Sequence, residues 1–276
     1  MDELQAKEAR LDADLRSISS LIVAYSGGVD SAYLAYAAAQ ALGEKVLAIT
    51  ALSESYSARD REIAKNCARA FGIPHEFINT SEVEDPKYRA NNPDRCFFCK
   101  SELFTKLDEL AAQRGFAAVA YGINVDDQGD WRPGHRAARD HAVLAPLLKA
   151  GLTKADIREL ARRAGIPVWD RPASACLASR IAYGLEVTPE RLAVIEKGEE
   201  AVRSLGFRQF RVRHHGNMAR LEIAPEELSR ALTSAMAAKF VEIFKSLGFV
   251  YVTLDLEGYR RGSLNASLTR RQSGQP

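Results

Sequence analysis

Hydrophobic positions in the first 170 or so residues alternate between short continuous apolar runs and longer segments with helical periodicity. The apolar runs cover residues 21–25, 45–50, 75–78 and 117–121, and the helical segments cover residues 32–42, 57–71 and 101–114. A glycine follows each helical segment, as is common where a helix ends. Short apolar runs that alternate with helices indicate parallel strands covered by helices. We therefore expect an α/β domain with a doubly wound, mostly parallel sheet.

The pattern changes after residue 183. Thr188 offers an N-cap hydroxyl and Pro189 suits the first turn of a helix, which the periodicity extends to residue 205. Two runs of alternating polarity, a helical stretch and an apolar run follow, at residues 209–214, 219–223, 224–247 and 250–254. This mixture predicts a smaller C-terminal α+β domain. We place the two domains at residues 1–182 and 183–276.

Composition restricts the class of protein. Of 276 residues, 46% are hydrophobic and 27% are charged, as in globular proteins rather than disordered chains. Lys and Arg number 38 against 36 Asp and Glu, so the net charge of +2 offers no global attraction to nucleic acid. The first residues lack a signal-peptide pattern and no stretch of eighteen apolar residues occurs. We expect a cytoplasmic protein that does not enter a membrane.

A glycine-rich loop, Ser26-Gly27-Gly28-Val29-Asp30-Ser31, lies between the first apolar run and the first helix. Here an α/β sheet presents backbone amides at a helix N-terminus, and two glycines let a polyphosphate approach them closely. The loop lacks the lysine of a Walker sequence. Ser26 and Ser31 can donate hydroxyls to phosphate, whereas Asp30 would repel phosphate unless Mg²⁺ lay between them. The alternative is a tight turn at Gly27-Gly28 with Asp30 as a helix cap.

Three of the four cysteines form a set that suggests metal chemistry. Cys96 and Cys99 are separated by two residues just before a predicted helix, and Cys176 lies far along the chain. Three thiolates are one ligand short of a filled tetrahedral zinc site or a closed iron–sulfur cluster, which leaves a position open for chemistry. Arg180 and other polar neighbours favour a thiolate at Cys176, although this residue could instead pack as a small apolar side chain. Cys67, inside a predicted helix, is assigned to the core.

Two arginines alternate with apolar residues in the second domain. Arg211 and Arg213 share one face of an expected strand, where alternate residues are about 7 Å apart. Two guanidiniums at this separation suit one phosphate held between them. A solvated face of a half-exposed strand produces the same alternation, so spacing alone leaves both interpretations open.

The glycine-rich loop matches, residue for residue, the signature of the PP-loop ATP pyrophosphatases, which have a HUP-like fold, transfer AMP from ATP to a substrate oxygen and release pyrophosphate. Further stretches resemble one family in particular, the ATP-dependent sulfur transferases called LarE, at residues 130–134, 174–184, 203–207, 211–213 and 251–256. This family makes the dithiocarboxylate groups of the nickel-pincer nucleotide cofactor. The resemblance implies an enzyme that uses ATP and Mg²⁺, acts on a small pyridinium mononucleotide and forms a homo-oligomer.

The resemblance also implies roles for individual residues. Arg132 would stabilise charge on the departing pyrophosphate. The two arginines of the second domain would hold the phosphate of the mononucleotide, and the carboxylates of Glu199 and Glu222 would lie near it as metal ligands. Where the family has a further acid, this chain has Arg230, so a metal there would lose one ligand.

The family resemblance gives Cys176 a catalytic role, because the corresponding cysteine gives up its sulfur and becomes dehydroalanine. Since Cys96 and Cys99 are also present, the chain resembles the three-cysteine branch, which is associated with a [4Fe-4S] cluster. We expect an enzyme that adenylylates a carboxylate of pyridinium-3,5-biscarboxylate mononucleotide and replaces it with a thiocarboxylate, with sulfur from Cys176 or the cluster. The alternatives are a tRNA-thiolating PP-loop enzyme and a nonenzymatic module that binds nucleotide and zinc.

Overall fold

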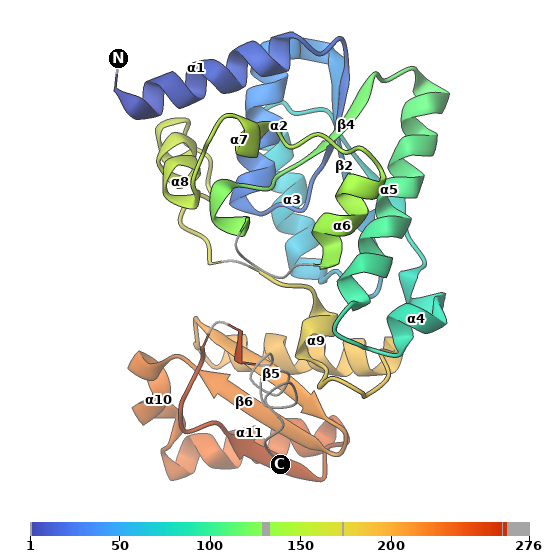
Figure 1. Cartoon of the computed structure of the whole chain (residues 1–276). Helices are drawn as coiled ribbons and strands as arrows, with labels where there is room; N and C mark the ends of the chain where they lie inside the picture. Colours follow the sequence, from blue (N-terminus) through green and yellow to red (C-terminus); the bar gives the residue numbers. More distant parts are fainter. Residues whose placement is uncertain (1, 129–132, 173, 261, 264–276) are drawn as a thin grey trace. The chain divides into compact units, whose positions relative to one another are not determined.

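The computed structural model describes residues 2–128, 133–172, 174–260 and 262–263 (Figure 1). The chain divides into two compact units. The first comprises Met1–Glu82 and Cys96–Ser174, and the second comprises Val83–Arg95 and Ala175–Pro276. The second unit is thus made of two separate parts of the sequence. The domain boundary that the sequence predicts between residues 182 and 183 stays a prediction.

Four parallel strands form the sheet of the first unit, in the order β3-β2-β1-β4. The strands are β1 (Leu21–Ala24), β2 (Val46–Leu52), β3 (His75–Asn79) and β4 (Ala118–Tyr121). Each strand forms at one of the four apolar runs in the sequence. Leu21 of β1 lies opposite both Val46 and Ala118, so β1 is paired on both sides. The expected α/β class with a parallel sheet is confirmed.

Helices cover both faces of this sheet (Figure 1). They are α1 (Glu3–Arg16), α2 (Val29–Leu42), α3 (Ala58–Ala70), α5 (Arg95–Arg114), α6 (Pro133–Asp140), α7 (Pro146–Lys149) and α8 (Lys154–Arg163). Leu21 and Val23 belong to a hydrophobic cluster with α1, α2, α3 and α8, whereas Ile22 joins a cluster with α5 and α6. Neighbouring strand residues point to opposite faces, so the sheet is doubly wound. No helix within the described ranges is long and apolar enough to cross a membrane.

One helix begins earlier than the sequence pattern indicates. The predicted segment starts at residue 101, but α5 begins at Arg95, so Cys96 and Cys99 lie in its first turns rather than before it. The reason is that Phe97 packs against the same hydrophobic cluster as Phe104, one apolar stripe of the helix.

The second unit contains a three-stranded sheet, β5-β6-β7, in which β5 and β6 are antiparallel and β6 and β7 are parallel. Its strands and helices are α4 (Pro86–Arg89), α9 (Pro189–Ser204), β5 (Phe210–His215), β6 (Met218–Ile223), α10 (Pro225–Ala231), α11 (Ser234–Ser246) and β7 (Tyr251–Leu254). Phe210 and Val212 of β5 face a core that includes Phe207 and Phe244. The smaller α+β part of the predicted fold class is therefore confirmed.

Short 3-10 helices connect several of these elements, at Gly43–Lys45, Glu82–Glu84, Val125–Asp127 and Leu177–Arg180. The last of them, η4 (Leu177–Arg180), directly follows Cys176, which is its N-cap residue.

The segment Val83–Arg95 is joined to the rest of the second unit by Asn91, which is fully buried. The Asn91 side-chain amide donates to the carbonyl oxygens of Ile181, Ala182 and Leu185 at 3.3, 2.9 and 2.9 Å. Since buried polar groups must find partners, these bonds, together with the bond from the amide of Val187 to the carbonyl oxygen of Arg89, hold the chain after η4.

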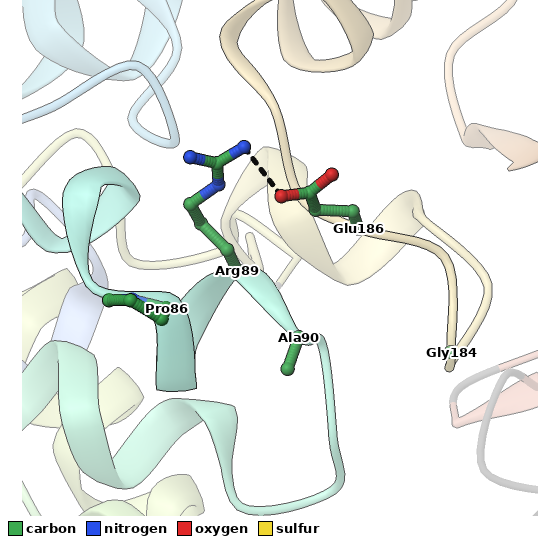
Figure 2. A pocket seen from close by; sticks show the side chains of 5 residues that line it. All are labelled: Pro86, Arg89, Ala90, Gly184 and Glu186. Atoms are coloured by element: carbon green, nitrogen blue, oxygen red, sulfur yellow. Dashed lines mark ion pairs between the residues drawn. The ribbon is translucent and has the colours of Figure 1, made fainter.

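The second unit also has a pocket of about 360 Å³ lined by Pro86, Arg89, Ala90, Gly184 and Glu186 (Figure 2). Arg89 forms an ion pair with Glu186 there, and both side chains are exposed. No residue predicted from the sequence as a site residue lines this pocket, so we assign it no role in the reaction.

Candidate functional site

The phosphate loop of residues 26–31 lies at the carboxyl edge of the four-stranded sheet, directly after β1. From β1 the chain continues to β2 and β3 on one side, and β4 pairs on the other side. Open α/β sheets bind ligands outside the carboxyl ends of their strands at such a reversal of strand order. The topology therefore places the loop where a nucleotide is expected.

Glycines let the backbone approach closely around this loop. Gly27 has a φ of +69°, and a Cβ added there would lie 2.8 Å from the Cβ of Ala64 on α3. Gly28 is the N-cap residue of α2 and has no side chain that could cap the helix amides. Gly122, after β4, would place a Cβ 2.8 Å from the amide nitrogen of Ser31. The N-terminus of α2 is thus left open to an anion.

Hydroxyl groups hold the shape of the loop. Ser31 Oγ donates to the carbonyl oxygen of Gly28 at 3.1 Å and accepts from the amide of Ser26 at 3.1 Å. The hydroxyl of Tyr56 lies 3.1 Å from the carbonyl oxygen of Ser26 and 3.0 Å from that of Asp60 on α3. Burial, followed by the nearby Asp60 charge, raises the pKa of Tyr56, so its hydroxyl stays a donor.

Asp30 lies in the first turn of α2 and does not cap it. Its Oδ2 accepts from the ammonium of Lys154, the first residue of α8. Its Oδ1 is buried and has no hydrogen-bond partner within the described part of the chain. A buried carboxylate oxygen without a partner is costly, and it is the hard oxygen ligand that Mg²⁺ prefers. Asp30 Oδ1 is therefore a single oxygen that a divalent cation could use, while the ammonium of Lys154 already holds the other oxygen of the same carboxylate.

Lys154 is a candidate site residue that the sequence reasoning missed. It stands 124 residues after Asp30 and just behind Thr153, which forms a capping box with Asp156. The local sequence indicates a helix start at Thr153 but carries no signal for the distant carboxylate. Lys154 brings a positive charge to Asp30 of the loop, which itself lacks the lysine of a Walker sequence.

A second carboxylate, Asp60, ties down the chain ahead of Cys176. Its Oδ1 accepts from the guanidinium of Arg171, and its Oδ2 accepts from Ser57 at 2.8 Å and Ser174 at 3.2 Å. Burial alone would raise the pKa of Asp60, but the hydrogen bonds from Arg171, Ser57 and Ser174 outweigh it and hold the pKa below its ordinary value.

Cys176 is half-buried and belongs to the second unit. Ser179 Oγ donates to its carbonyl oxygen at 2.7 Å, and the guanidinium of Arg180 donates to the same oxygen at 3.0 Å. These bonds fix the backbone around Cys176 at the start of η4.

Cys96 is exposed and Cys99 is half-buried, both in the first unit on α5. The Sγ of Cys99 lies 3.9 Å from Oε1 of Glu82, a buried carboxylate that also accepts from Ser53 and Ser55 at 2.6 and 3.0 Å. Among the residues that the structure describes, no group of three or more Cys, His, Asp and Glu is arranged to hold a metal ion. A cluster on the three cysteines therefore stays a prediction.

The remaining cysteine is in the core, as predicted. Cys67 of α3 is 2% exposed and packs with Ala64 and Ala68. Burial raises the pKa of its thiol, so Cys67 is a poor nucleophile.

Arginines and carboxylates are paired in the second unit. Arg213 donates to Glu222 at 2.8 Å and to the carbonyl oxygen of Ser179 at 2.9 Å, and Arg180 makes two bonds of 2.9 and 3.1 Å with Glu199. Glu222, which is fully buried, also accepts from Arg220 at 2.9 Å. In this structure Glu199 orients Arg180 as a bidentate pair, and Glu222 binds Arg213 and Arg220 through one bond each.

Arg211 lies on the same face of β5 as Arg213, as predicted. Burial, followed by the charge of Arg180, lowers the pKa of Arg211. The charge of Arg213 lowers this pKa as well, whereas the charge of Glu199 raises it, so the paired glutamates offset part of the repulsion among the arginines. The remaining predicted site residue, Arg132, lies outside the described residues.

A parallel sheet with an open glycine loop after its central strand, beside a carboxylate and a lysine, defines an ATP-using α/β enzyme of the PP-loop class. The family model of NAD synthase matches residues 8–103 of this chain, the part that holds the loop. A pyridinium-3,5-bisthiocarboxylic acid mononucleotide synthase from Lactiplantibacillus plantarum is 34% identical over 273 residues, which cover 99% of this chain and 98% of the relative. The chain belongs to the family of this synthase, the LarE sulfur transferases.

Two further relatives show how far the similarity extends. An uncharacterized protein from Synechocystis sp. is 41% identical over 267 residues, which cover 97% of this chain and 100% of the relative. A tRNA-specific 2-thiouridylase from Rickettsia felis is 28% identical over 195 residues, or 56% of this chain and 53% of the relative.

Proposed function

We propose that this enzyme adenylylates a carboxylate of pyridinium-3,5-biscarboxylate mononucleotide and replaces it with a thiocarboxylate, releasing AMP and pyrophosphate. The observation that carries the proposal is the open Ser26–Ser31 loop in a chain 34% identical to the L. plantarum synthase over nearly its whole length. The name of that relative gives its product as a pyridinium-3,5-bisthiocarboxylic acid mononucleotide.

The chemistry explains why ATP is needed. A carboxylate oxygen is a poor leaving group, but an oxygen joined to AMP leaves readily as part of a phosphate. The amides at the N-terminus of α2 would bind the triphosphate, with Lys154 beside it and Asp30 as a ligand of Mg²⁺. Arg132 would stabilise charge on the departing pyrophosphate.

The second unit supplies a site for the substrate phosphate. Arg211 and Arg213 would hold it, since they share a face of β5 and two guanidiniums at that separation suit one phosphate. Glu199 and Glu222 are engaged by Arg180 and Arg213, so their contacts support a role in orienting arginines. Metal binding by these glutamates would require them to release those partners.

Two sulfur sources remain under the same proposal. In one, the Cys176 thiolate attacks the activated carboxyl carbon, AMP leaves, and elimination transfers the sulfur and leaves dehydroalanine. In the other, Cys96, Cys99 and Cys176 hold a [4Fe-4S] cluster, which would supply a site for exogenous sulfide. Mass spectrometry of Cys176 after turnover distinguishes them, because only the first route removes sulfur from the protein.

The proposal is tested with Cys176→Ala, supplied with ATP and the pyridinium substrate. We expect exchange of pyrophosphate into ATP to continue, because activation does not use the thiol, while the thiolated product disappears. Cys67→Ala is the matched control and should retain both activities, since Cys67 is buried in the core. Normal thiolated product from Cys176→Ala would contradict the sulfur-donor role.

A second candidate function is tRNA thiolation. The similarity to a tRNA-specific 2-thiouridylase over 195 residues favours it, whereas the net charge of +2 argues against a nucleic-acid substrate. Retention of tRNA that weakens steeply with salt would support this candidate.

We also propose that the protein forms a homo-oligomer. Light scattering of the purified protein measures its mass in solution and tests this proposal.

A further inference from the structure

The carboxylate of Asp60 links two segments that are far apart in the sequence. Its donors Arg171 and Ser174 come 111 and 114 residues later, and Ser174 stands two residues before Cys176. The Asp60 and Arg171 side chains are only 14% and 22% exposed, so this ion pair is largely removed from water. Such a pair resists salt and holds its geometry better than a surface pair.

The Asp60 carboxylate is itself locked in place by the start of α3. Ser57, the N-cap residue, accepts from the amide of Asp60 at 3.1 Å and donates to its Oδ2 at 2.8 Å. A side chain fixed by its own helix turn can orient a distant partner, because it loses little conformational entropy when it binds that partner.

The same helix turn is bonded to the phosphate loop. The Tyr56 hydroxyl lies within hydrogen-bond distance of the carbonyl oxygens of Asp60 and of Ser26, the first loop residue. One short stretch, residues 56–60, therefore contacts both the loop that would bind ATP and the chain that leads into Cys176.

We propose that Asp60 is a positioning residue for sulfur transfer: by holding Arg171 and Ser174, it limits the freedom of the chain that leads to Cys176. This inference rests on the proposed function, because the position of Cys176 affects the reaction only if sulfur transfer takes place. Asp60 touches no reacting atom, and its role is to restrict the freedom of the chain ahead of the thiol.

Asp60→Asn tests the proposal, because it removes the charge and keeps the shape of the side chain. We expect pyrophosphate–ATP exchange within about twofold of wild type, while formation of the thiolated product falls about tenfold or more, as for loss of a charged hydrogen bond. Asp12→Asn is the matched control: Asp12 also pairs with an arginine, Arg16, but on an exposed face of α1. It should leave both activities unchanged.

A second readout does not depend on the reaction. Alkylation of Cys176 by iodoacetamide, followed by peptide mass spectrometry, should be faster in Asp60→Asn than in wild type, with Cys96 unchanged as an internal reference. If wild type shows neither exchange nor product, the proposed function fails. The alkylation rates still test whether the bonds of Asp60 to Arg171 and Ser174 restrict Cys176.

Arg171→Gln removes the same ion pair from the other side and should give the same pattern if Asp60→Asn does not fold. An equal loss of exchange and product would show that Asp60 only supports the fold, and would overturn the proposal. Unchanged product, or an unchanged alkylation rate at Cys176, would overturn it as well.

Discussion

Gly27 is the position in the phosphate loop where one added methyl group has the clearest consequence. Its φ of +69° is unfavourable for any residue with a Cβ, and Ala64 of α3 occupies the space that the Cβ would need. Two separate effects therefore select glycine at this position.

Gly27→Ala is expected to destabilise the protein more than Gly72→Ala. Gly72, at the end of α3, also has a positive φ, +60°, but nothing lies within 4 Å of an added Cβ. Both variants lose about 1–2 kcal/mol from the left-handed conformation, and only Gly27→Ala adds about 1–3 kcal/mol of overpacking. Urea unfolding measures the difference. Adding Ala64→Gly should recover only part of the overpacking, because the Cα of Ala64 would still lie 3.0 Å from the added Cβ. Equal losses in the two single variants would contradict this expectation.

At the scale of single residues, the loop residues could be predicted from the sequence, but Lys154 could not. A six-residue match reveals a phosphate loop because the glycines and hydroxyls are adjacent in the chain. The pair between Asp30 and Lys154 joins residues 124 positions apart, and only the packing of α8 against α2 creates it. Asp60 and Arg171 were missed as a pair for the same reason.

Among the elements, α9 and α11 show how a glycine permits close packing of two helices. A Cβ on Gly198 of α9 would lie 2.7 Å from Cε1 of Phe244, a fully buried side chain of α11. The glycine therefore serves the contact between the helices, although it weakens α9 as a helix.

Gly198→Ala sets helix propensity against packing. Alanine favours a helix by about 1 kcal/mol over glycine, whereas overpacking costs about 1–3 kcal/mol. We expect a net loss of stability of up to about 2 kcal/mol in chemical denaturation. In the Gly198→Ala background, Phe244→Leu should cost less than in wild type, because the smaller side chain relieves the contact. A more stable Gly198→Ala protein would contradict this account.

Most elements were predictable because their apolar residues follow a clear period. The four strands of the first sheet and the helix that begins at Thr188 agree with the pattern to within a few residues. By contrast, α1 escaped notice because only Leu11 and Leu15 are buried along its fourteen residues. The start of α5 was placed too late because Lys100 and Ser101 occupy the stripe positions between Phe97 and Phe104.

At the scale of the whole molecule, one buried and two half-buried histidines make stability depend on pH. Burial lowers the pKa of His75, His214 and His215. His75 Nε2 lies 2.8 Å from Thr50 Oγ1, whose proton goes to the carbonyl oxygen of Tyr25, so the ring donates through Nε2. Protonating these rings in place is unfavourable.

We expect the free energy of unfolding to fall as the pH drops below about 6.5, the ordinary pKa of histidine in an unfolded chain. The unfolded chain then binds protons that the folded state resists. The contribution of the neutral rings to the free energy of unfolding is complete above that pH. It decreases as the pH falls, until the histidines of the folded state are protonated as well. Urea midpoints at pH 7.5 and 5.5 measure the effect, and His75→Gln should reduce it. An unchanged midpoint would contradict the assignment of neutral buried rings.

The composition of the second unit also limits how this chain can be taken apart. A fragment that starts at residue 175 leaves Asn91 behind, so the carbonyl oxygens of Ile181, Ala182 and Leu185 lose their amide donor. Cutting the gene at a single point therefore cannot give two independent halves. Anyone who wants the C-terminal half by itself should graft residues 83–95 onto it through a designed linker.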